Sequence, residues 1–445
     1  MTPGVQPLWR GRVLAVLGIL LCAFSLRSAV ASLSPVVDLI GEEFELSSAV
    51  LGLIGTLPPV CFAVLGLLTP MLERLLGIER LAVIALSAIT LGLIGRGFAT
   101  DSIGLLAGTA VIFAGVGMGN ILLPPLVKKY FADRIGLMMT VYTTMIAFST
   151  FVPPLIAVPV ADAVGWRFSM AMWAAFSLAG VIPWLVLMLR PAAPTRFLSE
   201  RSETKGRFLS ERSETKGAQE PDSETTGPAL TGPVATSPDT RRLFARLARI
   251  PLVWALALTF ATSSTMAYVS FAWLPSIVID TAGVDAATAG FMLSLWSFIG
   301  LPASLLVPLL VVRFQATRPV FIVGSVGGMV GLLGLLLFPV PELLWLWMIL
   351  FGVVGLLFPL ALVLISIRSR TPESAVLLSS FVQSAGYVLA AIFPMLVGIL
   401  HDATGGWTVP ILAVAAVLVL TFPAGMIAGR RVTVEDEWER KHGRW

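Results

Sequence analysis

The segment VLAVLGILLCAFSLRSAVASLSPVVD, residues 13–38, is apolar along nearly its whole length, and Arg27 is its only charged side chain before Asp38. A helix rises 1.5 Å per residue, so about 20 apolar residues cross the hydrocarbon core of a bilayer. The segment is therefore long enough to span a membrane as one helix. It is too long to be the apolar part of a cleavable signal peptide, and similar segments follow it.

The same character extends through most of the 445 residues, of which 57% are hydrophobic and 13% are charged. Soluble domains carry about twice that charged fraction, because their surfaces need polar cover. We predict an all-α membrane protein with twelve transmembrane helices. The predicted helices cover residues 13–38, 48–71, 79–99, 103–127, 136–160, 168–189, 250–278, 287–312, 319–339, 342–366, 374–399 and 408–429.

Basic residues gather in alternate loops between these segments, and cytoplasmic loops are enriched in Lys and Arg. We therefore predict a multi-pass protein of the cell (inner or plasma) membrane with cytoplasmic N- and C-termini. The opposite side keeps only Arg96 and Arg167, which we interpret as interface or loop residues. The cytoplasmic side holds Arg10, Arg12, Arg74, Arg80, Lys128, Lys129, Arg134, Arg313, Arg318, Arg368 and Arg370. The net charge of +4 thus reflects topology and does not indicate nucleic acid.

The chain divides into two helical regions around a polar stretch. In that stretch RFLSERSETKG occurs twice in tandem, at 196–206 and 207–217, and the composition predicts disorder. Residues 241–249 have the pattern of a short amphipathic helix on the membrane surface. We predict a cytoplasmic N-terminus (1–12), a six-helix bundle (13–189), a cytoplasmic linker (190–249), a second six-helix bundle (250–429) and a cytoplasmic tail (430–445).

An internal repeat relates the two regions. Pro35 recurs as Pro275, an offset of 240, and Gly165-Trp166 recurs as Gly406-Trp407, an offset of 241. Pro70-Met71-Leu72 recurs as Pro308-Leu309-Leu310, an offset of 238. These matches fall at equivalent places in the two six-helix halves. Parallel repeats of this kind are typical of transporters that bind their substrate near the midplane, between the halves.

Several short stretches are distinctive. They are Leu26-Arg27-Ser28, Gly115 to Asn120 running on to Lys128-Lys129-Tyr130-Phe131, Gly165-Trp166-Arg167, Ala272-Trp273-Leu274-Pro275, Phe358-Pro359-Leu360, and Gln383 to Tyr387 running on to His401–Trp407. Together they resemble the major facilitator superfamily and, within it, the cyanate and 2-nitroimidazole porter family. The resemblance implies a two-bundle fold and transport of cyanate-like ions or nitro-aromatic compounds. Arg74 stands where the superfamily's signature after the second helix usually has an aspartate.

Arg27 is the most informative single residue. An arginine at the centre of a bilayer costs at least about 2.5 kcal/mol, so its side chain must face the bundle interior or a wet cavity. Every acidic residue lies near the end of a predicted helix, in a loop or in the tail. An anionic or electron-rich substrate would supply the missing partner, because guanidinium stays charged and donates several hydrogen bonds in a plane. The alternative is that Arg27 donates to helix carbonyls or to water.

Six further polar or aromatic residues within the segments are candidates for substrate binding. They are Asn120, Tyr142, Tyr268, Trp273, Gln383 and Tyr387. A few polar groups among apolar walls are typical of a small-molecule site. Each also has a structural alternative, because amides join helices by hydrogen bonds and aromatic residues pack or anchor at the membrane interface.

We therefore expect a secondary active or facilitated transporter of a small anionic or nitro-aromatic solute, working by alternating access around Arg27. Its partners would be that solute and the lipid bilayer, and it would act as a monomer without a cofactor, a metal or catalytic residues. The alternative is a multidrug efflux porter for amphipathic compounds, although a porter for cations would need an accessible carboxylate. A membrane enzyme is disfavoured, because the chain has only His401 and His442 as histidines.

Overall fold

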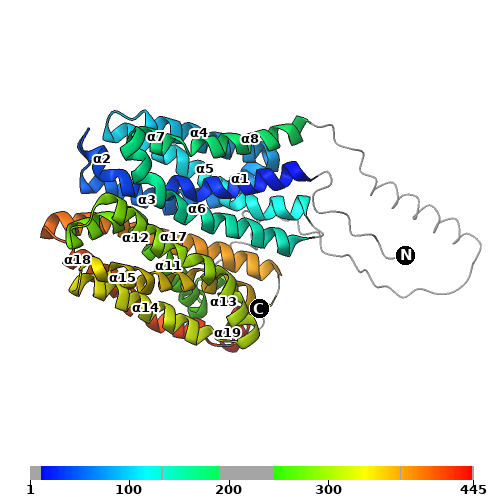
Figure 1. Ribbon diagram of the computed structural model, residues 1–445. Coiled ribbons are helices and arrows are strands. Elements are labelled where there is room, and N and C mark those ends of the chain that lie inside the picture. Colours follow the sequence, from blue (N-terminus) through cyan, green and yellow to red (C-terminus); the bar gives the residue numbers. More distant parts are fainter. Residues whose placement is uncertain (1–11, 132–133, 190–244, 371, 443–445) are drawn as a thin grey trace, which may run out of the picture.

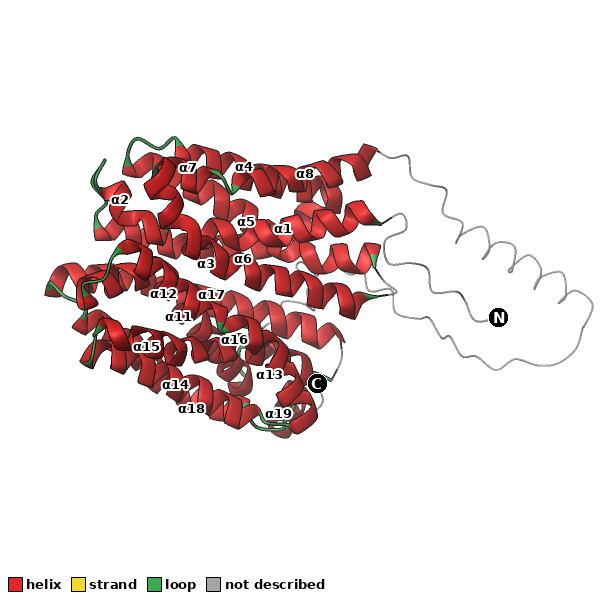
Figure 2. Ribbon diagram, in the orientation of Figure 1, coloured by secondary structure: helices red, strands yellow, loops and turns green. Residues whose placement is uncertain are grey.

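Two bundles of helices lie side by side in this computed structural model, which describes residues 12–131, 134–189, 245–370 and 372–442 (Figure 1). All regular structure in the described residues is helical (Figure 2). The first half comprises α1 (Val13–Ala31), η1 (Ser34–Val36), α2 (Val37–Gly41), α3 (Ser48–Leu76), α4 (Ile78–Gly97), α5 (Ser102–Tyr130), α6 (Ile135–Val164), α7 (Trp166–Ala171) and α8 (Ala174–Leu189). The second comprises α11 (Pro251–Ala282), α12 (Ala286–Phe298), α13 (Gly300–Phe314), α14 (Thr317–Leu337), η2 (Pro341–Leu343), α15 (Leu344–Gly352), η3 (Val353–Leu356), α16 (Leu357–Ile367), α17 (Pro372–Thr404), α18 (Thr408–Ala428) and α19 (Val434–His442).

Twelve helical segments of the described chain are long and apolar enough to cross a membrane, which confirms the predicted number. When α1, η1 and α2 are taken together as the first span, the predicted ends lie within five residues of the observed ends. Proline pairs such as Pro124-Pro125 sit inside continuous helices, as expected for spans that must satisfy their own backbone. The first span is interrupted instead, because α1 ends at Ala31 shortly before Pro35. Proline lacks an N–H donor and crowds the carbonyl four residues earlier, which favours a break there.

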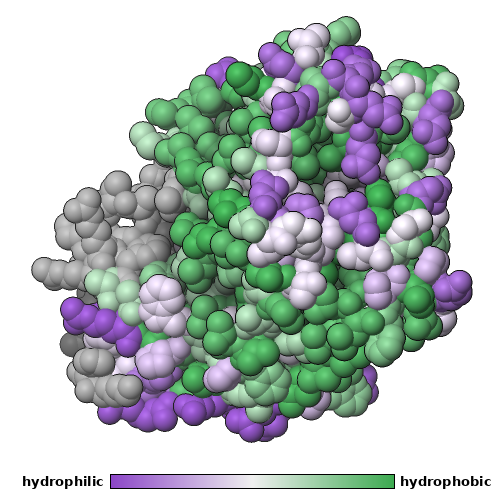
Figure 3. Space-filling view, turned by 90° about the vertical axis from the view of Figure 1, so that its left-hand side faces the viewer, coloured by the Kyte–Doolittle hydropathy of each residue, from purple (hydrophilic) through white to green (hydrophobic). Residues whose placement is uncertain are grey.

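Each half has two ends, which we name by what lies there. The linker end is where α1 begins, α8 ends and α11 begins; the far end carries the loops before α3, α5 and α12. Three side chains at the far end cap helix N-termini: Ser47 accepts from the Val50 N–H, Asp101 from Gly104 and Asp285 from Thr288. Figure 3 faces the far end and shows hydrophilic side chains gathered beside broad hydrophobic areas.

The repeated Gly-Trp motif makes the same contact in both halves. Trp166 Nε1 donates to Glu43 Oε1 at 2.9 Å, and Trp407 Nε1 donates to Asp280 Oδ2 at 2.8 Å. Both carboxylates lie at the far end of the first span of their half, and both tryptophans lie at the start of the sixth. Each hydrogen bond therefore connects the sixth span of a half to the first. Arg167 also pairs with Glu43 and is about two-fifths exposed, in agreement with its interpretation as an interface or loop residue.

The tail forms a helix that packs on the linker end of the second half. Arg370, in the loop before α17, pairs with Asp436 and Glu439 of α19. The Val434 N–H donates to the Arg368 carbonyl at 2.9 Å. Of the predicted amphipathic segment at 241–249, only 245–249 are described, and Leu247 there is buried in the core of this half. The tandem repeat at 196–217 lies outside the described residues.

Candidate substrate site

Arg27 lies four residues before the end of α1, at the middle of the first membrane span (Val13–Gly41), on the side that faces the second half. Its guanidinium carbon is 5.9 Å from the centre of the Phe62 ring of α3, within the range of a cation–π contact. The side chain is half-buried. Within the described residues no carboxylate forms an ion pair with Arg27, in line with the expectation from the sequence.

Two tyrosines of the second half complete the surroundings of Arg27. The Tyr268 hydroxyl of α11 interacts with the guanidinium and with the Tyr387 hydroxyl of α17. The Phe62 ring centre lies 6.2 Å from that of Tyr268 and 5.6 Å from that of Tyr387. We call Arg27, Phe62, Tyr268 and Tyr387 the central cage. The first half supplies its charge and one ring, and the second half supplies two rings with hydroxyls.

Three other predicted site residues, Asn120, Tyr142 and Gln383, lie outside the central cage, and a role for them in substrate binding stays a prediction. Asn120 is half-buried on α5, next to Gly119, which packs against Leu26 of α1. Tyr142 of α6 is buried in the core of the first half. Gln383 lies one turn before Tyr387 on α17 and donates to Ser379 Oγ at 2.7 Å.

Trp273 has a packing arrangement of its own. Its Nε1 donates to the Pro394 carbonyl at 2.8 Å, and its ring centre lies 5.7 Å from that of Trp407. It is five residues beyond Tyr268 on α11, about 7.5 Å further toward the far end. Trp273 thus joins α11 to α17 between the cage and the far end. A role for it in substrate binding stays a prediction.

The interpretation of Arg96 as an interface or loop residue is wrong. Arg96 is fully buried in the last turn of α4. Its Nε and Nη2 donate to Thr109 Oγ1 at 3.2 and 3.1 Å, and its Nη1 donates to the Ala29 carbonyl at 3.0 Å. The residue is only one position from the helix end, and the sequence shows that position but not that the side chain turns inward.

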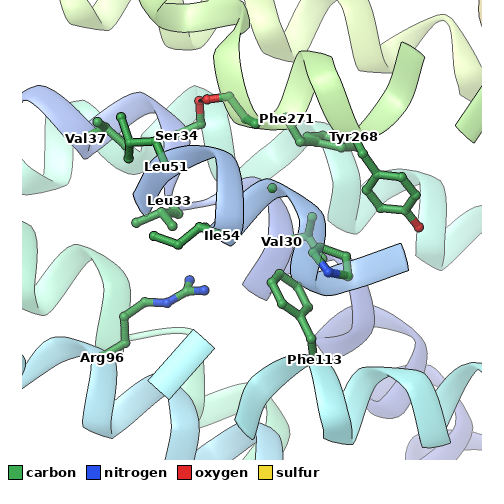
Figure 4. A pocket seen from close by; sticks show the side chains of 13 residues that line it. Val30, Leu33, Ser34, Val37, Leu51, Ile54, Arg96, Phe113, Tyr268 and Phe271 are labelled. Carbon is green, nitrogen blue, oxygen red and sulfur yellow. Dashed lines mark hydrogen bonds between the residues drawn. The ribbon is translucent and has the colours of Figure 1, made fainter. Parts of the chain in front are cut away.

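A cavity lies between the central cage and the far end, and Arg96 points into it (Figure 4). We call it the far cavity. Its free volume is about 30 Å³. Tyr268 lines it as well, so the far cavity adjoins the cage. Its walls are otherwise apolar apart from Ser34, and they include Val30, Leu33, Val37, Ile54, Phe113 and Phe271.

The two halves close against each other at the far end. The contacts run between α3 and α17 and between α6 and α12. Thr56 of α3 donates to the Ala391 carbonyl at 3.0 Å, and Ser34 donates to the Ala272 carbonyl at 3.3 Å. Glycines permit the close approach: a Cβ on Gly55 would lie 2.7 Å from the Ala272 Cβ, and one on Gly290 would lie 2.7 Å from the Pro154 carbonyl oxygen.

The described residues contain no cluster of three or more His, Cys, Asp or Glu side chains that could hold a metal ion. Both cysteines are unpaired thiols. The central cage thus consists of one guanidinium, aromatic rings and hydroxyls, which are groups that can bind a small solute.

Comparisons with known proteins agree with this architecture. The model of the Major Facilitator Superfamily matches residues 19–388. The chain is 31% identical to an uncharacterized transporter (YycB) of Bacillus subtilis, over 98% of this chain and 97% of the relative. In Escherichia coli it is 29% identical to the 2-nitroimidazole transporter, over 95% and 96%, and 23% identical to the cyanate transport protein CynX, over 91% and 96%. Among solved structures, a bacterial homologue of the human lysosomal transporter Spinster superposes with a TM-score of 0.70 at 15% identity, covering 96% of this chain and 98% of that one.

Proposed function

From the premise that this chain belongs to the major facilitator superfamily, we propose that it carries a small anionic or nitro-aromatic solute across the plasma membrane by alternating access. The central cage is the binding site. The observation that supports this most directly is Arg27, a guanidinium inside the membrane span whose described neighbours are aromatic rings and hydroxyls. A charge in this position is costly unless something pairs with it, and a bound anion would do so.

The chemistry of the cage suits such a solute. A guanidinium donates hydrogen bonds in a plane, which matches a carboxylate, a cyanate-like ion or a nitro group. The rings of Phe62, Tyr268 and Tyr387 offer apolar faces on which an aromatic solute would stack. Two similar proteins are named for carrying 2-nitroimidazole and cyanate, and these solutes share hydrogen-bond acceptor atoms and a planar or linear form that the cage would accept.

The cage is shared between the halves, and this supports a rocking mechanism. Arg27 and Phe62 belong to the first half, whereas Tyr268 and Tyr387 belong to the second. Closing the far end brings the two sets together, and separating the halves there would open the cage to that side. Because one chain supplies both sets, we propose that the transporter acts as a monomer.

The orientation follows from charge. The linker end carries Lys128, Lys129, Arg313, Arg318 and Arg370, so we place it in the cytoplasm together with both termini. The described conformation would then be closed toward the outside. Few acidic side chains lie within the spans, which disfavours a carboxylate relay for protons and leaves the driving gradient to the solute or its own proton.

The test is uptake of radiolabelled cyanate and of 2-nitroimidazole into proteoliposomes that contain the full-length protein. We expect Arg27→Gln to reduce uptake of either solute that the wild type carries by about 100-fold, because losing hydrogen bonds to a charged group inside the protein is worth roughly 3 kcal/mol. Arg313→Gln, at an exposed position of the linker end, is the matched control and should transport normally. Equal uptake by Arg27→Gln and wild-type protein would refute the role of Arg27.

The multidrug efflux alternative makes an opposite prediction. A porter for amphipathic cations needs a carboxylate near its site, and no described carboxylate pairs with the cage. If lipophilic cations competed with the labelled solute more strongly than small anions of equal concentration, the efflux function would be favoured over the proposal made here.

A further inference from the structure

The far cavity contains a second buried cation that the central cage does not use. Arg96 is fully buried, and its three hydrogen bonds go to one hydroxyl and one carbonyl. A guanidinium carries five N–H donors, so two have no protein acceptor in the described chain. No carboxylate of the described residues compensates its charge. Taking an unpaired ion out of water costs several kcal/mol, and such a site is stabilised when an anion enters it.

The second half of the molecule contains a matching cavity without a charge. It is lined by apolar residues and Ser270, and its free volume is about 20 Å³. Five lining positions of the two cavities correspond across the internal repeat with offsets of 238 to 240: Val30 with Ser270, Ser34 with Leu274, Val37 with Ile277, Arg96 with Leu335, and Phe113 with Phe351. The remaining walls differ, because α3 and α11 complete the far cavity and α17 and α18 complete the second one. Beside the corresponding spans of the second half, a cavity therefore forms with Leu335 at the position equivalent to Arg96. Packing alone does not require a charge at this position.

We propose that Arg96 forms a second anion-binding station in the far cavity, which holds a small inorganic anion between the central cage and the far end. The cavity volume sets the size of the ligand. A water molecule needs about 10–15 Å³ of such space, so the far cavity admits a ligand of at most about three heavy atoms, such as chloride or cyanate. An aromatic ring does not fit while the far end is closed.

The position of the station places it on the transport path. Tyr268 belongs both to the central cage and to the wall of the far cavity (Figure 4). Ser34 lines the same cavity and donates across the closed contact to Ala272 of the second half. An anion leaving Arg27 toward the far end would thus meet Arg96 next. The identification of this anion with the transported solute rests on the proposed function, whereas the anion site itself does not.

The experiment measures the thermal unfolding midpoint of purified full-length protein against increasing sodium cyanate or sodium chloride, with sodium gluconate holding the ionic strength constant. A ligand that binds only the folded state raises the midpoint with saturation. In Arg27→Gln, which lacks the charge of the central cage, we expect cyanate still to give a saturable rise. Adding Arg96→Gln to that variant should abolish it. Loss of the entire response in Arg27→Gln alone would overturn the second station and leave the proposed function standing.

Two further variants separate binding from a structural role. Arg96→Lys keeps the charge but loses the planar donor fork, and in the Arg27→Gln background it should raise the half-saturating cyanate concentration at least about tenfold. Thr109→Val removes the acceptor of two Arg96 hydrogen bonds and should lower the midpoint while the cyanate response persists. If both variants lower the midpoint and neither changes the half-saturating concentration, Arg96 serves only to join α4 to α1 and α5 by hydrogen bonds, and the proposal fails. A response to chloride without any to cyanate would overturn the assignment to the transport path.

Discussion

Gly55 offers a direct test of the closed far end, because its missing side chain permits contact between the halves. A Cβ at this position would lie 2.7 Å from the Ala272 Cβ and 2.8 Å from the Pro394 Cβ. Carbon atoms in contact prefer about 3.5–4.0 Å, and forcing extra volume into a packed contact costs about 1–3 kcal/mol. Both neighbours belong to the second half, so Gly55→Ala penalises only the state in which the halves are closed at this end. The ratio of open to closed molecules should rise about 5- to 150-fold.

The assay is the rate at which a cysteine in the far cavity reacts with a membrane-impermeant maleimide. Ser34→Cys provides that thiol, since Ser34 is 6% exposed and lines the cavity, and Cys22→Ala with Cys61→Ala removes the native thiols. Adding Gly55→Ala should accelerate labelling by the same factor as the change in the open population. Gly92→Ala is the matched control: its Cβ would lie 2.6 Å from Ile112 Cγ1, within the first half. It should lower stability without faster labelling. Equal acceleration by both variants, or by neither, would refute the reasoning.

Four other outcomes are expected. Tyr387→Phe removes a hydroxyl that the second half presents to the cage, so it should lower the maximal uptake rate more than it raises the half-saturating solute concentration. Trp407→Phe loses the hydrogen bond to Asp280, about 1 kcal/mol, and should lower the unfolding midpoint by roughly 2 °C, whereas Trp345→Phe at an exposed position should not. Arg370→Ala should release α19, seen as faster hydrogen exchange in residues 434–442. The Asp436 carboxyl accepts from Thr433 and Arg370, which lower its pKa to about 2. Because this pKa lies below that of the unfolded chain, the attachment of α19 is kept above about pH 4 and weakens as pH falls toward 2.

The helices were predictable because the bilayer imposes one length on every span. Apolar runs of about 20 residues can be recognised directly in the sequence, and the first polar residues on either side of a run mark its ends. Arg27 was predictable for the same reason, since a charge inside such a run must have a function or a partner. The interruption of α1 before Pro35 was not, because Pro124-Pro125 and other prolines lie in continuous helices. Whether a proline breaks a helix depends on the neighbours that satisfy the freed carbonyl.

Other parts of the site could not be predicted from the sequence. Phe62 is one apolar residue in an apolar run, and nothing in its pattern separates a ring that faces Arg27 from one that faces lipid. The direction of Arg96 depends on the rotation of α4 about its axis, and the helix has apolar residues on all sides. The segment VEDEWERKH near the C-terminus has the composition of a solvated tail, and its attachment to Arg370 depends on α19 lying beside the loop before α17.

The distribution of charge between the halves determines which contacts change during transport. Arg27 and Arg96 both belong to the first half. In the internal repeat, the position equivalent to Arg96 in the second half is occupied by Leu335. An anion held by either arginine therefore stays with the first half while the second half rotates. The Tyr268 and Tyr387 hydroxyls are then the contacts that differ between the two access states, and a ligand shifts such an equilibrium only through interactions that differ between them. Affinity should thus depend mainly on the arginines, and the rate of exchange between states mainly on the tyrosines.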